Sequence, residues 1–165
     1  LISAMEFLDG NYHLLLGGDG PLRAEMEKLI EEKGLQDRVT LFGYLDTGTI
    51  PLAFSAADVF VMSSVMKSEA FGIVQIEAMS CGTPVVTTDV PGSGMSWVNA
   101  QGESGLVVPP RDPEALAAAI RGICEDSAAH ERLSAGARER YERLFAFPVM
   151  IDKTMQLYEK IHSEN

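Results

Sequence analysis

Short apolar runs alternate with helical segments along most of this chain, and that alternation constrains the fold more than any other feature. The expected strands cover residues 13–16, 38–42, 58–62, 84–87 and 105–108. Because these runs are short and mostly apolar, they are typical of strands that are buried on both faces of a sheet. We therefore predict an α/β fold, with a doubly wound parallel sheet and helices on both faces.

The segments between and after these strands have helical periodicity. They cover about 21–33, 49–57, 72–80 and 93–99, followed by 112–124, 128–145 and 149–162. Asp112 and Pro113 form a typical helix start, and Pro148 is expected to break the helical run that precedes it. Residues 1–10 contain no initiating Met and look like the last turns of a helix that begins upstream.

Polar or glycine-rich loops follow four of the predicted strands. They cover 17–20, 43–46, 63–70 and 89–94. In a doubly wound sheet, ligands bind in the crevice at the carboxyl ends of the strands. The positions of these loops therefore predict a ligand site along one edge of the sheet.

Two carboxylates stand eight residues apart at the third of these loops. Glu69 comes just before a helix that is expected to start near Phe71 or Gly72, and Glu77 lies inside that helix. The helix start offers free backbone N–H groups and the positive end of the dipole, so it can hold an anion. Carboxylates on either side could accept hydrogen bonds from neutral hydroxyls, which fits a diphosphate joined to a sugar at each end. The alternative is a solvated helix start on which the carboxylates only complement the dipole.

Composition and charge exclude several classes of protein. A net charge of −11 argues against a nucleic-acid partner, and no run of eighteen apolar residues could span a membrane. Lys67 is the only Lys or Arg between Arg38 and Arg111, so it is the one local cation for a bound phosphate. Cys81 and Cys124 show no disulfide or metal-ligand spacing, which suits the cytoplasm.

Six short motifs occur in an order that resembles one large enzyme family. They are G-D-G-P at 18–21, V-T-L-F-G at 39–43, A-A-D-V-F-V at 56–61, E-A-F-G-I-V-Q-I-E-A-M at 69–79, C-G-T-P-V-V at 81–86 and G-L-V-V-P-P at 105–110. Together they resemble the C-terminal, donor-binding domain of retaining glycosyltransferases with the GT-B fold, family 4 or glycosyl transferases group 1. The motif at 69–79 carries the pair of glutamates that is the hallmark of this family.

The resemblance implies a role for each residue around the glutamate pair. Glu69 would be the catalytic-site carboxylate that binds hydroxyls of the donor sugar, and Glu77 would bind the ribose. The backbone N–H groups of Phe71, Gly72 and Ile73 would hold the diphosphate. Phe71 is also expected to anchor the turn as a packed aromatic side chain. A role for Glu69 as a nucleophile, by analogy with retaining glycosidases, is the less favoured alternative.

Residues of the neighbouring loops complete the implied donor site. Gly18 belongs to it through the G-D-G-P loop, and Gly43, Tyr44 and Leu45 would line the nucleotide base. Lys67 and Ser68 lie in a loop that is longer than in many relatives, where they could contact the diphosphate or the sugar. The alternative for these two is a purely solvated loop. Trp97 stands where relatives often carry a glutamate, and we expect it only to pack.

The resemblance also implies the ligands and partners. The donor would be a UDP-, GDP- or ADP-sugar, and no metal or other cofactor would be required. The acceptor would be a glycan or a lipid-linked acceptor, as in bacterial polysaccharide or lipopolysaccharide synthesis, bound by an N-terminal domain. Any peripheral membrane association would come through that domain, and the reaction would be cytoplasmic.

We expect residues 1–165 to be a single donor-binding domain, with C-terminal helices over 128–162. The N-terminal acceptor domain, and the first strand with its phosphate-binding Arg and Lys, would precede Leu1. Alone, the chain should be inactive and bind nucleotide weakly. Two other classes remain open: a non-catalytic nucleotide-binding module and a GT-B sugar-nucleotide epimerase. The paired glutamates favour the transferase over both.

Overall fold

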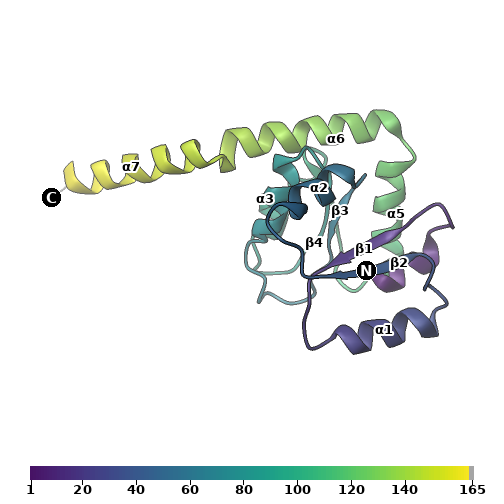
Figure 1. Cartoon of the computed structure of the whole chain (residues 1–165). Helices are drawn as coiled ribbons and strands as arrows, with labels where there is room; N and C mark the ends of the chain where they lie inside the picture. Colours follow the sequence, from purple (N-terminus) through teal and green to yellow (C-terminus); the bar gives the residue numbers. More distant parts are fainter. Residues whose placement is uncertain (164–165) are drawn as a thin grey trace.

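Parallel strands form the centre of the molecule (Figure 1). The computed structural model describes residues 1–163, so residues 164 and 165 of the predicted domain lie outside the described part. The strands are β1 (Leu14–Gly17), β2 (Val39–Gly43), β3 (Phe60–Met62), β4 (Val85–Thr88) and β5 (Gly105–Val108). Each agrees with its predicted position to within two residues, which is the usual uncertainty of element ends.

The hydrogen bonds divide these strands into two sheets. β1 pairs with β2, and a separate three-stranded sheet has the order β3-β4-β5, with every pairing parallel. The predicted α/β fold with parallel strands is confirmed. The sequence did not indicate the division, because the pairing partner of a strand depends on the order of strands in space.

Helices connect the strands and cover them. They are η1 (Ile2–Phe7), α1 (Arg23–Glu32), α2 (Thr49–Ala56), α3 (Ile73–Ser80), α4 (Met95–Val98), α5 (Pro113–Cys124), α6 (Ser127–Arg140), η2 (Tyr141–Phe145) and α7 (Phe147–Ser163). The predicted helix over 128–145 is two elements, since α6 ends at Arg140 and a π-helical turn, η2, follows. The predicted break near Pro148 is confirmed, because Ala146, with a ψ of 139°, is not helical and α7 starts at Phe147.

The predicted start of α5 has the expected cap. The carboxylate of Asp112 accepts a hydrogen bond of 2.9 Å from the backbone N–H of Ala115, and Pro113 occupies the first turn. Asp126 caps α6 in the same way, through the N–H groups of Ala128 and Ala129. Such caps satisfy N–H groups that have no partner inside the helix, and each typically contributes about 1 kcal/mol.

The apolar core has two parts, and β4 contributes to both. Val86 packs in the larger cluster with η1 and α5, whereas Val85 packs in the smaller cluster with α3 and α6. Both valines are fully buried. Because neighbouring side chains of a strand point to opposite faces, this alternation shows helices packed on both faces of the sheet.

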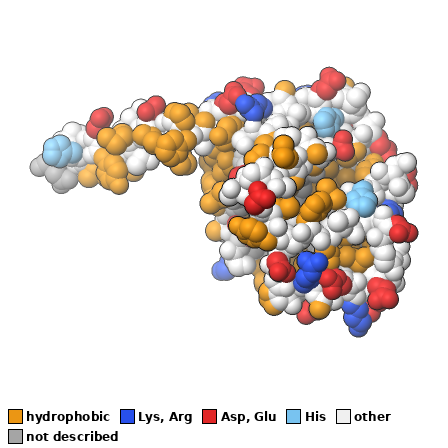
Figure 2. All heavy atoms as spheres, viewed as in Figure 1, with side chains coloured by type: hydrophobic (Ala, Val, Ile, Leu, Met, Phe, Trp, Pro, Cys, Tyr) orange, Lys and Arg blue, Asp and Glu red, His pale blue; other side chains and the backbone are white. Residues whose placement is uncertain are grey.

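The last helix is different from the others. α7 contains no buried residue, and it projects away from the rest of the molecule as a continuation of the line of α6 (Figure 1). Hydrophobic side chains gather along it (Figure 2). The largest of them are Phe147, Met150, Ile151, Met155, Leu157, Tyr158 and Ile161, each at least 43% exposed.

Two glycines in neighbouring helices should respond oppositely to alanine. A Cβ on Gly136 in α6 would lie 2.0 Å from the carbonyl oxygen of Glu103, whereas a Cβ on Gly122 in α5 has nothing within 4 Å. We expect Gly136→Ala to destabilise the fold by about 3 kcal/mol, because backbone must move, and Gly122→Ala to stabilise it by about 0.5 kcal/mol through helix propensity. Urea unfolding of both variants checks this. Equal midpoints would contradict the close approach of α6 to Glu103.

Both cysteines are free and half-buried, as expected from their spacing. Burial, followed by the carboxylates of Asp58 and Glu125, raises the pKa of the Cys124 thiol to about 11. In a Cys81→Ser variant, alkylation of Cys124 should therefore accelerate about tenfold per pH unit from pH 8 to pH 10, because only the thiolate reacts. Iodoacetamide labelling followed by mass spectrometry measures the rate. A plateau below pH 9.5 would show that the thiol is not shielded in this way.

Candidate functional site

The loop between β3 and α3 folds back so that the Glu69 side chain bonds the backbone just before the helix. Its carboxylate oxygen Oε1 accepts a hydrogen bond of 2.8 Å from the backbone N–H of Gly72. Gly72 is the N-cap of α3 and has left-handed φ and ψ angles of 75° and 62°. The prediction of free N–H groups at this helix start is therefore corrected for Gly72, since its N–H already has a carboxylate partner. The helix begins at Ile73, one residue after the later of the two predicted starts.

Glycine is required at position 72 for two independent reasons. Its φ is positive, and a Cβ there would lie 2.5 Å from Nε2 of Gln75 and 2.8 Å from Sδ of Met62. Residues with a side chain rarely adopt the left-handed backbone region, and a side chain at position 72 would also clash with Gln75 and Met62. The close packing of Gln75 and Met62 under the turn therefore fixes where Glu69 can sit.

The loop after β4 supports the same turn from the other side. The hydroxyl of Ser93 donates a 2.7 Å hydrogen bond to the carbonyl oxygen of Glu69. The N–H of Gly94 donates to the carbonyl oxygen of Ala70 at 2.6 Å. Two of the loops predicted to meet at the carboxyl ends of the strands, 63–70 and 89–94, are therefore in contact. Glu69 itself remains partly exposed, so its second carboxylate oxygen can meet a ligand.

Glu77 lies further along α3, on its exposed surface, and Ile73 at the helix start is also exposed. The two are four residues apart, about one helical turn, so both lie on the same side of α3. The structure thus places one carboxylate at the start of the helix and one a turn inside it. A ligand extending along this side of α3 could contact both.

Phe71 belongs to a small aromatic cluster beside the turn. Its ring centroid lies 6.2 Å from that of Trp97 and 6.3 Å from that of Phe145. Arg140, which is buried, donates from Nε to the carbonyl oxygen of Val98 and lies 5.7 Å from the Trp97 ring centroid. Phe71 and Trp97 therefore pack against each other as predicted, but Phe71 is not the core side chain that was expected, since the two are 39% and 58% exposed. Sequence reasoning did not identify Arg140, because an arginine is ordinarily expected at the surface.

The predicted base-lining residues form a second group. The N–H of Gly18 donates a 2.7 Å hydrogen bond to the carbonyl oxygen of Gly43, and both glycines have positive φ. Leu45 lies against Gly17, and Tyr44 is 83% exposed. The loops that follow β1 and β2 are therefore joined at the same ends of their strands.

Two cationic side chains, Lys67 and Arg23, lie at or beside these loops. Lys67 is exposed next to the equally exposed Ser68, and it forms no ion pair within the described residues. Arg23, in the first turn of α1, was not predicted. Its Nη1 lies 3.6 Å from where a Cβ on Gly43 would be, and its Nε pairs with Glu27 at 3.0 Å. Its position just after the glycine-rich loop 17–20 was the signal available in the sequence.

Hydrogen bonds also shape the loop after Tyr44. The Thr49 hydroxyl, with the N–H groups of Thr49 and Gly48, holds the pKa of Asp46 below its usual value. Asp46 thus stays ionised and caps α2 instead of serving as a proton donor.

Residues 1–163 hold no group of three His, Cys, Asp or Glu side chains arranged for a metal ion. None of their helices combines the length and apolarity needed to cross a bilayer.

A comparison with known protein families identifies the family of this chain. The profile described as glycosyl transferases group 1 matches residues 1–140. The chain belongs to this glycosyltransferase family. Lipopolysaccharide core biosynthesis glycosyltransferase LpsD of Rhizobium meliloti is 36% identical over 97% of this chain, and D-rhamnosyltransferase WbpZ of Pseudomonas aeruginosa is 34% identical over 88%. These alignments cover 45% and 37% of the two relatives, so the chain spans less than half of their length.

Solved glycosyltransferase structures share the fold of the chain. Anabaena HepE in complex with UDP superposes with a TM-score of 0.87 and 26% identity, over 99% of this chain and 44% of HepE. Sucrose-phosphate synthase from Thermosynechococcus elongatus gives a TM-score of 0.85 at 37% identity, over 99% of this chain and 42% of the synthase. The Rossmann-like α/β fold of this glycosyltransferase chain is thus shown by comparison as well as by its own strands.

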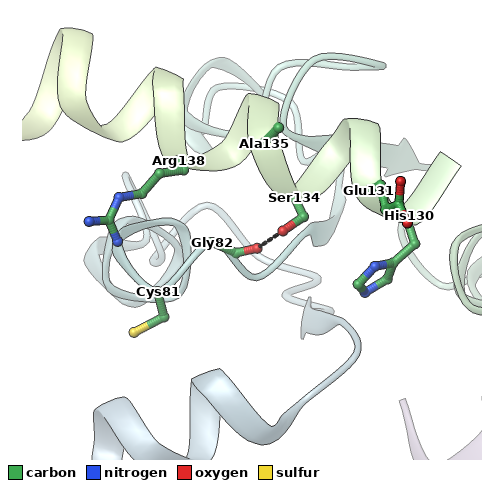
Figure 3. Close-up of a pocket in the computed structure, with 7 residues that line it drawn as sticks. All are labelled: Cys81, Gly82, His130, Glu131, Ser134, Ala135 and Arg138. Carbon is green, nitrogen blue, oxygen red and sulfur yellow. Dashed lines mark hydrogen bonds between the residues drawn. The ribbon is translucent and has the colours of Figure 1, made fainter. Parts of the chain in front are cut away.

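One cavity of this glycosyltransferase chain lies away from the predicted site. It measures about 480 Å³ and lies between the end of α3 and α6 (Figure 3). Its lining residues are Cys81, Gly82, His130, Glu131, Ser134, Ala135 and Arg138. The ring of His130 bonds the carbonyl of Asp58, just before β3, so the cavity lies at the amino ends of the strands. Ligands of such sheets bind at the opposite edge, and we therefore assign the site to the Glu69 turn.

Proposed function

We propose that this chain binds the nucleotide-diphosphate sugar donor of a retaining glycosyltransferase. The observation that carries the proposal is the Glu69–Gly72 turn at the carboxyl ends of the strands, with Glu77 one turn further along α3. In this arrangement Glu69 binds hydroxyls of the donor sugar, and Glu77 binds the ribose. The diphosphate lies between them, at the start of α3.

The chemistry of transfer explains this use of a helix start. Breaking the bond between sugar and phosphate leaves negative charge on the diphosphate. The dipole of α3, the N–H of Ile73 and the cation of Lys67 stabilise that charge without reorganisation, which lowers the barrier. We propose that the diphosphate leaves without help from a metal ion. Glu69 orients the sugar ring so that the acceptor attacks with retention of configuration.

Relatives suggest the donor and the pathway. HepE was crystallised with UDP and with UDP-glucose, so a UDP-sugar is the first donor to test, ahead of GDP- and ADP-sugars. LpsD takes part in lipopolysaccharide core biosynthesis, and we propose a similar cytoplasmic role in glycan assembly. The acceptor, a glycan or lipid-linked glycan, is assigned to a separate acceptor domain, because the matched relatives are more than twice as long as their match to this chain.

Titration of the chain with UDP-glucose, GDP-mannose and ADP-glucose tests the proposal. One donor should shift the backbone amide signals of Phe71, Gly72 and Ile73 in NMR spectra. We expect a Kd on the order of 1 mM, because exposed Lys67 and the ion-paired Arg23 supply little positive charge at these loops. The signals of Gly82 and Ser134, in the distant cavity, serve as the internal control. Shifts confined to those two residues would place the ligand elsewhere.

A further inference from the structure

We propose that Gln75 is a positioning residue for Glu69, acting through the peptide group between Phe71 and Gly72. The proposal rests on the donor-binding role of Glu69 given above and extends it to a residue that contacts no ligand itself. In this role Gln75 sets the direction in which the Glu69 carboxylate points.

The two side chains hold opposite ends of one peptide group. Nε2 of Gln75 donates a 3.2 Å hydrogen bond to the carbonyl oxygen of Phe71. Oε1 of Glu69 accepts a 2.8 Å hydrogen bond from the N–H of Gly72. The carbonyl and the N–H belong to the same planar unit, so fixing one end fixes the other. Gln75 therefore determines where the Gly72 N–H points, and with it where Glu69 is held.

The burial of Gln75 is costly in a way that packing does not explain. Its side chain is 0% exposed, and its Oε1 is the one buried side-chain oxygen or nitrogen without a hydrogen-bond partner in residues 1–163. An unpaired buried acceptor lowers stability, whereas an apolar side chain of similar length would fill the same space without that cost. The amide is therefore explained by the one bond it does make, to Phe71.

Hydrogen bonds from the loop after β4 hold the carbonyl oxygens of Glu69 and Ala70, and they leave the Phe71 carbonyl to Gln75. Gly72 adopts backbone angles that most residues avoid, and glycine also leaves neighbouring conformations open. Without the bond from Gln75, the Phe71–Gly72 peptide can rotate, and Glu69 then loses its N–H partner. A mobile Glu69 carboxylate no longer holds its second oxygen at a fixed position relative to the sugar. The position of a group that binds the substrate strongly affects the rate of sugar transfer.

The test compares Gln75→Met with wild type in the 165-residue chain, labelled with ¹⁵N. The chemical shift of the Gly72 amide proton reports the hydrogen bond to Glu69. The shift in Glu69→Ala gives the value expected when this bond is completely lost. Gln75→Met should change the Gly72 chemical shift by at least half of the change seen in Glu69→Ala. Its unfolding temperature should be no lower than that of wild type. Gln101→Met is the matched control, because Gln101 is exposed and bonds the N–H of Val107, and it should leave the Gly72 signal unchanged.

An unchanged Gly72 signal in folded Gln75→Met would overturn the proposal. If that variant does not fold, the wild-type chain still decides, because the Nε2 protons of Gln75 should exchange slowly with solvent; fast exchange would refute the bond. Binding separates this proposal from the proposed function. Gln75→Met should weaken UDP-glucose binding about tenfold and UDP binding less, since Glu69 contacts the sugar. A wild-type chain that binds none of the three sugar nucleotides refutes the proposed function, while the Gly72 signal still tests Gln75.

Discussion

Replacing Glu69 with alanine is expected to reduce sugar transfer by the whole protein about a thousandfold, while most of the affinity for the nucleotide remains. The carboxylate is proposed to hold the donor sugar, and UDP alone lacks that sugar. The same substitution removes the hydrogen-bond partner of the Gly72 N–H, so it should also cost about 1 kcal/mol of stability. Steady-state transfer assays and calorimetric titration with UDP measure the two effects separately.

Glu77→Ala is the matched control, because it removes the second carboxylate, inside α3, without touching the turn. It should weaken the binding of UDP and of UDP-glucose alike, and its main effect should be on KM. Glu69→Gln separates the charge from the hydrogen bond, since its amide oxygen can still accept from the N–H of Gly72. Full transfer activity in both alanine variants would refute the assignment of the glutamate pair.

Replacing Gly105 with alanine is expected to destabilise the fold by about 4 kcal/mol, which is most of the stability of a marginally stable domain. A Cβ on Gly105 would lie 1.7 Å from the carbonyl oxygen of Val85 and 2.7 Å from Oδ1 of Asn99. Val85 and Gly105 are paired in the β4–β5 ladder, and the buried Asn99 side chain bonds the same Val85 carbonyl. The sheet therefore has to separate or shift to admit one methyl group.

Gly10→Ala provides the comparison, because a Cβ there meets nothing within 4 Å and its φ is not positive. Its unfolding midpoint in urea should stay close to that of wild type. Gly105→Ala should show a much lower midpoint or fail to accumulate in soluble form. A difference of less than about 1 kcal/mol between the two variants would be incompatible with the close pairing of β4 and β5.

Periodicity predicted most of the architecture, because burial on both faces leaves a local pattern in each strand. The strand at 105–108 and the helix start at Thr49 were located to the residue. The cap of Asp112 could also be predicted, since the capping residue and the helix it serves are adjacent in sequence. The division into two sheets could not, because strand order is a long-range property.

The site shows the same limit. The spacing of Glu69 and Glu77 indicated a carboxylate at a helix start and another inside the helix. It did not indicate that Glu69 would bond Gly72, because that depends on the left-handed backbone of one glycine. The guanidinium of Arg23 reaches Gly43 from α1, and although the place of Arg23 just after loop 17–20 was visible in the sequence, its contact with β2 was not.

The exposed stripe of α7 has a consequence for handling the chain in solution. A lone helix of its 17 residues is only marginally stable in water, and an apolar stripe on it favours contact between copies. Scattered light and sedimentation should consequently depend on protein concentration. The net charge of −11 opposes this attraction, so added salt, which screens the charge, should promote clustering. Dilute, low-salt buffer is therefore the condition in which this chain should remain dispersed.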